Sequence, residues 1–216
     1  MVEAMVQRDL WKETPAVKGR IARYWDSRSE SFKEQRDAEL HSEQHQLWEQ
    51  ELLSHLPQDR SLRILDVGCG CGFFTLMLAE HGHRVTGIDL TGSMIRKGRE
   101  LAQEYGVAAD LRVMDAEHPD FSDDTFDAIV TRNLTWTLPH PAAHRMLSGA
   151  QMDECMNIYR MLPISGWKRP DWDVCILKQM GCREVTADDR IGEKLYLHES
   201  AFSVPYPIFR IKAVKA

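Results

Sequence analysis

The spacing of hydrophobic residues divides the chain into a helical first part and a mixed second part. From Ile21 to Leu56, apolar and aromatic residues recur at helical spacing among many Glu, Gln and Arg residues. This pattern predicts amphipathic helices with a break near residues 27–31 and an end at Pro57. We therefore expect an N-terminal helical region over residues 1–57 and the core of a single domain over residues 58–216.

Short apolar runs and helical segments alternate after residue 60. The expected strands cover residues 62–67, 84–89, 110–114 and 126–131, and the expected helices cover residues 73–80 and 93–105. Such alternation, at intervals of roughly 20 residues, is typical of right-handed βαβ units. The pattern predicts an α/β fold with a doubly wound, mostly parallel sheet.

The pattern is weaker beyond Pro139. We expect helical pieces near residues 152–161 and 172–180, and two closing strands at residues 182–186 and 209–214.

Charge and cysteine content narrow the class of protein. The formal net charge of -6 disfavours a nucleic-acid partner, because phosphate binding needs a basic surface. No apolar run approaches the ~20 residues of a membrane span, and the first ten residues do not resemble a signal peptide. The five cysteines give no metal-binding spacing. We expect a cytoplasmic protein with reduced cysteines and no metal, and the oligomeric state stays open.

A glycine-rich segment between the first strand and the following helix carries the clearest chemistry. It contains Gly68, Gly70 and Gly72, and Asp66 stands two residues before the first of these glycines. Glycines at this point allow a tight turn and let a ligand approach the backbone. Asp89 closes the next strand, where a carboxylate can accept hydrogen bonds from both hydroxyls of a ribose.

Two classes of ligand share this geometry. A dinucleotide site normally offers Gly-x-Gly-x-x-Gly with the helix end facing a pyrophosphate. Here the glycines are evenly spaced, and the carboxylate of Asp66 would repel a pyrophosphate but suits an ammonium and a sulfonium group. The segment therefore favours S-adenosylmethionine over a nicotinamide cofactor.

The sequence ILDVGCGCGFFTLMLAE resembles the first signature of the class I S-adenosylmethionine-dependent methyltransferases of small-molecule type. VTGIDLTGSMI and VMDAEHPDFSDDTFDAIVTRNLTWTLPHP are similar to the motifs that follow it, and RYWDSRSESF resembles the helical cap of that family. The resemblance implies a Rossmann-like domain in which residues 1–57 cap the cofactor. The cofactor-binding residues that it implies are Tyr24, Asp66, Gly68, Cys69, Gly70, Gly72, Asp89, Leu90, Met94, Asp115, Ala116 and Asn133.

One departure from the family concerns the fifth strand of the sheet. After residues 144–148 the sequence passes directly to Gly149 and Ala150, and no fifth strand can be recognised. We interpret this as a missing segment near residues 148–150, because a parallel sheet that loses an interior strand leaves backbone groups unpaired. A naturally shortened domain is the alternative.

Methyl transfer from a sulfonium depends mainly on proximity and alignment, so the chemistry demands no single catalytic residue. Weak candidates for contact with the acceptor or for a base are His140, Asn133 and Tyr24, with Trp136 as a wall of the pocket. We expect an enzyme that methylates a small molecule. The alternatives are a protein that binds the cofactor without turnover and, less favoured, a nicotinamide-dependent oxidoreductase.

Overall fold

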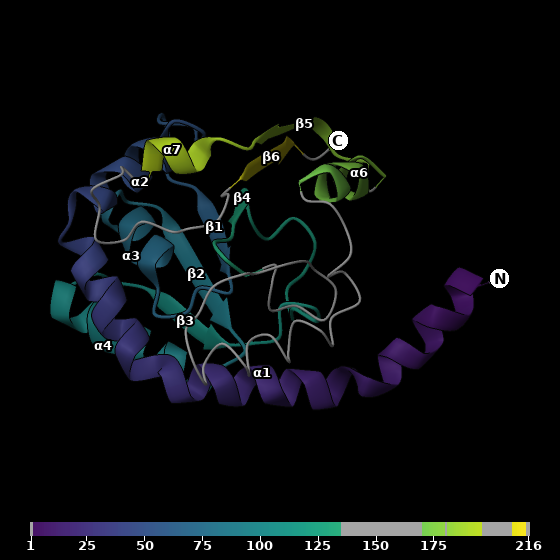
Figure 1. Cartoon of the computed structure of the whole chain (residues 1–216). Helices are drawn as coiled ribbons and strands as arrows, with labels where there is room; N and C mark the ends of the chain where they lie inside the picture. The colour runs from purple at the N-terminus through teal and green to yellow at the C-terminus, as the bar shows by residue number, and fades with distance from the viewer. Residues whose placement is uncertain (1, 135–169, 180, 196–208, 215–216) are drawn as a thin grey trace. The chain divides into compact units, whose positions relative to one another are not determined.

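The computed structural model of the chain describes residues 2–134, 170–179, 181–195 and 209–214 (Figure 1). Its contacts divide the chain into two compact units, Met1–Leu138 and Pro139–Ala216. The described elements of the first unit are α1 (Val2–Leu40), α2 (Glu43–Leu53), β1 (Arg63–Val67), α3 (Phe73–Glu80), β2 (Arg84–Asp89), α4 (Gly92–Tyr105), β3 (Asp110–Val113) and β4 (Ala128–Val130). Those of the second unit are α6 (Asp171–Gln179), β5 (Arg183–Asp188), α7 (Ile191–Leu195) and β6 (Arg210–Val214).

The N-terminal part is helical, but the predicted break near residues 27–31 is wrong. Helix α1 runs without interruption to Leu40, and the chain breaks at residues 41–42, where Ser42 caps α2 by accepting a hydrogen bond from the Gln44 N–H. Within α1, three serine hydroxyls donate to the backbone carbonyl three residues earlier, namely those of Ser27, Ser29 and Ser31. Because these hydroxyls find partners inside the helix, the serine cluster does not end it.

The four strands of the first unit form one parallel sheet in the order β3-β2-β1-β4. The strands coincide with the predicted ones to within two residues at each end, and the α/β fold with a doubly wound type of sheet is confirmed. Strands of a parallel sheet end at the same edge, so the segments after β1, β2, β3 and β4 all meet there. Figure 1 shows the strands pointing toward α1, which crosses this edge.

One face of the sheet is buried against α3 and α4. Ile64 of β1 and Val85 of β2 are paired in register and lie in the largest cluster of buried side chains, together with most of α3. Leu111 of β3 joins Cys69 and Ile95 in a second cluster under α4. The sheet and these two helices therefore fix the starting points of the loops that follow β1 and β2.

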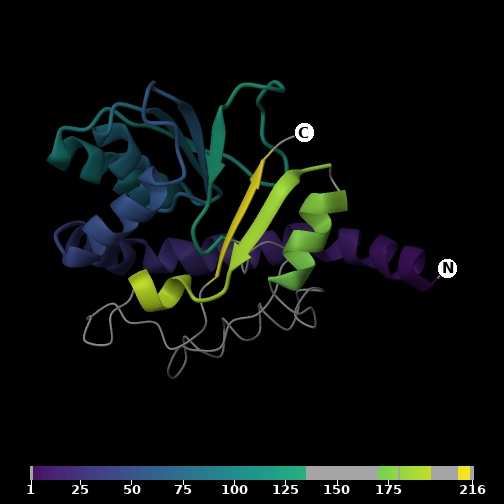
Figure 2. The ribbon, with the colours of Figure 1, turned by 90° about the horizontal axis from the view of Figure 1, so that it is seen from above.

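The second unit contains an antiparallel pair of strands, β5 and β6. Figure 2 shows the two strands side by side with α6 alongside. The predicted helix near residues 172–180 and both closing strands are confirmed, within two residues of the predicted bounds. The predicted helix near residues 152–161 and the point near residues 148–150, where a fifth strand was expected to be missing, lie outside the described residues.

Among the described residues, no helix has both the length and the apolar character that a membrane span requires.

The close packing of β2 leads to a stability prediction at Gly87. A Cβ atom there would lie 2.6 Å from Thr75 Oγ1 and 2.7 Å from Leu111 Cδ2, with Cys69 Sγ at 3.0 Å. We expect Gly87→Ala to lower the free energy of unfolding by about 1–3 kcal/mol in urea denaturation, because an added methyl group overpacks this layer.

Gly19 in α1 provides the matched control. Among the described residues, a Cβ there would meet Arg23 Nη1 alone, at an ordinary distance of 3.5 Å. Gly19→Ala should stabilise the chain by about 0.5–1 kcal/mol, because alanine favours a helix interior. Equal effects of the two substitutions would contradict the packing described for Gly87.

Candidate functional site

The glycine loop of residues 68–72 connects β1 to α3 and is folded back on the neighbouring strand. The N–H groups of Gly68 and Cys69 both donate to the carbonyl of Ile88, at 2.8 and 2.9 Å. Gly70 has a φ of +55°, and a Cβ atom on it would lie 3.0 Å from the Phe32 ring of α1. The loop can therefore pass under α1 only because this position lacks a side chain.

Asp89, at the end of β2, is bonded both to the glycine loop and to the residue that precedes α4. Its Oδ2 atom accepts a hydrogen bond from the Gly70 N–H at 3.1 Å, and its Oδ1 atom accepts one from the Thr91 N–H at 2.8 Å. Burial raises the pKa of this carboxyl, while the two backbone donors oppose the shift. Each carboxylate oxygen has a second acceptor position, so the half-buried Asp89 can also accept hydrogen bonds from a ligand hydroxyl.

Asp66 lies beneath the loop and supports it from inside. Its side chain is only 2% exposed, and Oδ2 accepts a hydrogen bond from Thr75 Oγ1 of α3 at 2.7 Å. Burial raises the pKa of this carboxyl to about 7, although the hydrogen bond from Thr75 acts in the opposite direction. The proposed contact of Asp66 with a ligand ammonium group stays a prediction, and what the structure shows is its bond to α3.

The segment after β3 brings Asp115 and Ala116 to the same edge of the sheet. Asp115 Oδ1 accepts a hydrogen bond from the Glu117 N–H at 3.0 Å, which caps the turn. Asp115 Oδ2 accepts a hydrogen bond from Lys18 Nζ of α1 at 2.5 Å, and the same ammonium group pairs with Glu117 Oε2 at 2.5 Å. Both Asp115 and its neighbour Ala116 are half-buried.

Two predicted cofactor neighbours, Met94 and Cys69, are buried more deeply than Asp89 and Asp115. Met94 is 2% exposed and belongs to the main core cluster, with its sulfur 3.6 Å from Cys71 Sγ. Leu90, by contrast, is half-buried. Burial raises the pKa of the Cys69 thiol well above its ordinary value and that of Cys71 to about 12. Both thiols are therefore protonated at neutral pH and unsuited to nucleophilic catalysis.

Helix α1 covers the site with residues that recur every seven positions. These are Lys18, Trp25, Phe32 and Glu39. Seven residues are close to two helical turns, so all four lie on one face of the helix. Lys18 meets Asp115, Phe32 meets Gly70, and the Trp25 ring packs edge-to-face on that of Phe32 at 5.4 Å. Tyr24, a predicted cofactor neighbour, is half-buried and continues this aromatic row at 5.2 Å from Trp25.

The C-terminal end of this helix face is joined to the segment after β4. Glu39 is fully buried and accepts hydrogen bonds from Arg132 at 2.5 and 3.2 Å and pairs with Arg36 at 2.5 Å. The Arg132 guanidinium also lies 4.6 Å from the ring centres of Trp48 and Phe73. This buried ion pair ties α1 to the edge of the sheet, and removal of one partner from such a pair is costly.

Four residues of this edge were not predicted from the sequence as part of the site, namely Lys18, Phe32, Glu39 and Arg132. The seven-residue spacing is visible in the chain once the face of α1 that meets the site is known. No local pattern, however, distinguishes Glu39 from the other acids of α1, since its partner Arg132 lies 93 residues away.

The remaining predicted residues belong to the segment after β4. Asn133 follows Arg132, is exposed, and has a φ of +58°, which is uncommon for a residue other than glycine. The candidates Trp136 and His140 lie outside the described residues. In the part of the chain that the structure describes, no group of three His, Cys, Asp or Glu side chains could hold a metal ion.

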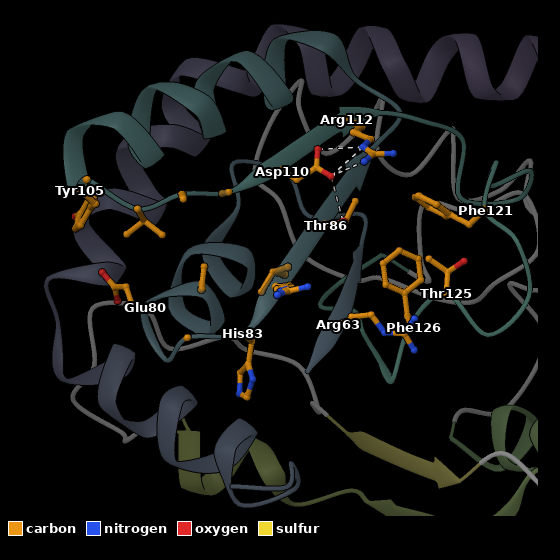
Figure 3. Close-up of a pocket in the computed structure, with 18 residues that line it drawn as sticks. Arg63, Glu80, His83, Thr86, Tyr105, Asp110, Arg112, Phe121, Thr125 and Phe126 are labelled. Atoms are coloured by element: carbon orange, nitrogen blue, oxygen red, sulfur yellow. Dashed lines mark hydrogen bonds and ion pairs between the residues drawn. The ribbon is translucent and has the colours of Figure 1, made fainter. Parts of the chain in front are cut away.

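A separate hollow of about 1090 Å³ lies away from these residues, over the amino-terminal half of the strands (Figure 3). Its walls include Arg63, Thr86 and Asp110, and Thr86 and Arg112 both donate to the carboxylate of Asp110. None of the predicted site residues lines this hollow. The candidate site is therefore the opposite, carboxyl-terminal edge of the sheet.

Comparison with known proteins identifies the kind of domain. Residues 64–152 match the family model described as a methyltransferase domain, and they include the glycine loop, Asp89 and Asp115. Residues 64–152 therefore belong to a methyltransferase domain, in line with the resemblance to the class I S-adenosylmethionine-dependent methyltransferases. S-adenosylmethionine is the cofactor of this family.

The chain is similar over short stretches to two curated methyltransferases. It is 42% identical over 84 residues to a phosphatidylethanolamine N-methyltransferase of Cereibacter sphaeroides, covering 38% of this chain and 41% of the relative. It is 38% identical over 86 residues to a ubiquinone biosynthesis O-methyltransferase of Xylella fastidiosa, covering 38% of this chain and 33% of the relative. The matches thus span less than half the length of these relatives.

Among solved structures, the methyltransferase domain is similar to phosphoethanolamine N-methyltransferase 1 of Haemonchus contortus, in complex with phosphoethanolamine and S-adenosylhomocysteine. The TM-score is 0.46 at 23% identity, over 58% of this chain and 27% of the other.

The buried state of Asp66 predicts an unusual pH dependence of stability. Its pKa of about 7 in the folded chain lies above the ordinary value of 3.8, so the folded state holds a proton that the unfolded state releases between these pH values. Stability from this group is therefore present below pH 4 and is lost as the pH rises to 7. Between pH 5 and pH 8, the free energy of unfolding of Asp66→Asn should therefore rise relative to that of wild type by up to roughly 2–4 kcal/mol, as measured by urea denaturation.

Asp127 offers a control of opposite sign. A hydrogen bond from Arg63 lowers the pKa of Asp127 to about 2, so this group loses its stabilising effect only as the pH falls below 4. The difference between Asp127→Asn and wild type should be constant from pH 5 to pH 8. A constant difference for Asp66→Asn as well would show that Asp66 is ionised in the folded chain.

Proposed function

We propose that this chain binds S-adenosylmethionine at the carboxyl-terminal edge of the sheet and transfers its methyl group to a small molecule. The observation that supports this most strongly is the placement of Asp89, which is bonded to the N–H of Gly70 and lies beside the loop it closes. A carboxylate in this position can accept hydrogen bonds from both ribose hydroxyls of a nucleoside.

The residues at this edge suit the parts of that cofactor. The methionine part would lie along the backbone of residues 68–72, and Asp89 would hold the ribose. Asp115 and Ala116, with Leu90, would border the adenine. Asp66 lies buried beneath the loop, and a bound ligand that carries ammonium and sulfonium groups would favour the ionised form of its carboxyl.

The chain's own contribution to the reaction is to position the two reactants and to keep water away. When bound, the cofactor supplies an electrophilic methyl group on a sulfur that is already a good leaving group. The face of α1 that carries Tyr24, Trp25 and Phe32 would cover the cofactor, and Asn133 would border the acceptor. Alignment of donor and acceptor then supplies most of the rate enhancement.

We infer that the acceptor is a small molecule with an amine or a hydroxyl group. The two curated relatives are named for N- and O-methylation, and the net charge of -6 disfavours a nucleic-acid acceptor. We also propose a cytoplasmic location, in keeping with the buried free thiols of Cys69 and Cys71.

Replacement of Asp89 tests the ribose assignment. Asp89→Ala should weaken the binding of S-adenosylhomocysteine by about 30- to 150-fold in calorimetric titration, because roughly 2–3 kcal/mol of charge-assisted hydrogen bonding is lost. The control is Asp110→Ala, which removes an exposed carboxylate at the start of β3 and should leave the affinity unchanged. An unaltered affinity of Asp89→Ala would refute the assignment.

Turnover is tested with the full chain, S-adenosylmethionine and a panel of amine and phenol acceptors, by following the S-adenosylhomocysteine formed. Formation that depends on one acceptor supports the proposal. Tight binding with no turnover on any acceptor would instead favour the binding protein, and binding of NADH in its place would favour the oxidoreductase.

A further inference from the structure

Lys18 of α1 donates a hydrogen bond to Asp115 at the edge of the sheet where the candidate site lies. Its ammonium group lies 2.5 Å from Asp115 Oδ2 and 2.5 Å from Glu117 Oε2. The Lys18 side chain is 15% exposed, and those of Asp115 and Glu117 are 28% and 18% exposed. A half-buried ion triad of this kind is screened less than one on the surface.

The two oxygens of Asp115 have different tasks. Oδ1 accepts the Glu117 N–H and thereby fixes the turn after β3. Oδ2 is the oxygen bonded to Lys18, which comes from a helix 97 residues earlier in the chain. The turn therefore needs only one oxygen, and the other is available for exchange between partners.

We propose that Lys18 competes with the exocyclic amino group of the cofactor's adenine for Asp115 Oδ2, and so sets how strongly this site distinguishes adenine from other purines. This inference rests on the proposed function, in which Asp115 borders the adenine. An ammonium group forms a stronger hydrogen bond with a carboxylate than a neutral amino group does. Lys18 therefore weakens the preference that Asp115 alone would give.

Glu117 makes the exchange possible at moderate cost. When Asp115 Oδ2 turns to the ligand, the ammonium group of Lys18 keeps its bond to Glu117 Oε2 and is not left without an anion. A lone Lys18–Asp115 pair would have to be broken completely, which is costly for half-buried charges. Glu117 thus acts as the alternative partner that frees Asp115.

The test compares two probes that differ only at the exchanged contact. S-adenosylhomocysteine carries the amino group, whereas its analogue with unsubstituted purine in place of adenine carries a hydrogen at that position and cannot donate from it to Asp115. Calorimetric titration of the full chain gives the ratio of the two dissociation constants, that of the purine analogue over that of S-adenosylhomocysteine. A general change in stability or in the closure of α1 affects both probes alike and leaves this ratio unchanged.

In Lys18→Met, which keeps the aliphatic length without the charge, the ratio should rise about five- to tenfold, because Asp115 is released to the amino group. In Glu117→Gln the ratio should fall below that of wild type, because Lys18 then has Asp115 as its only carboxylate within this triad. The control is Lys33→Met, which removes another ion pair of α1, with Glu104 of α4 at 2.7 Å, and should not alter the ratio.

Each outcome decides the proposal. A rise for Lys18→Met with a fall for Glu117→Gln supports competition for Asp115. An unchanged ratio in both variants, with either probe still bound, overturns the competition but leaves the proposed cofactor site intact. If the wild-type chain binds neither probe, the proposed function fails and this inference fails with it. The Glu117→Gln result keeps the test decisive if Lys18→Met does not fold.

Discussion

The site depends on one steric constraint, the close approach of two other segments to the backbone of the glycine loop. A Cβ on Gly68 would lie 2.5 Å from Leu134, which follows β4, and a Cβ on Gly70 would lie 3.0 Å from the ring of Phe32 in α1. Both residues also have positive φ. Three segments that are far apart in the sequence can therefore meet at this edge only because the loop has no side chains there.

The second requirement is that α1 stays on this edge. Its contact face combines the cation of Lys18, the rings of Trp25 and Phe32, and the buried anion of Glu39. Desolvation of Glu39 is unfavourable by itself, and the hydrogen bonds from Arg132 offset that cost only in one geometry. The pair therefore specifies the position of the helix as well as contributing to stability. Helix α1 is thus held to this edge at Lys18 and at Glu39, which suits a helix that keeps water from the site.

Local sequence signals were sufficient to predict the sheet, the helices beside it and the glycine loop. They succeed because a buried parallel strand, a glycine turn and an acid at a strand end each depend on a few consecutive residues. They fail where a residue's role depends on distant partners. The serine cluster of α1 suggested a break because serine often ends helices, but its hydroxyls bond within the helix.

The same limit applies to the charged residues of the site. The resemblance implied that Asp66 and Asp115 contact the cofactor, which stays a prediction. The structure adds partners that the sequence did not suggest, because Asp66 is bonded to Thr75 and Asp115 to Lys18. These partners lie 9 and 97 residues away, and no spacing rule connects the second pair. The long separation also explains why the Lys18 triad could be found only in the folded chain.

The most direct test of the proposed site is a crystal structure of the full chain with S-adenosylhomocysteine. We expect the ribose hydroxyls on Asp89, the methionine part along residues 68–72 and the adenine beside Asp115. Binding of the ligand in the hollow lined by Arg63 and Thr86 would contradict it, as would a nucleoside that makes no contact with Asp89.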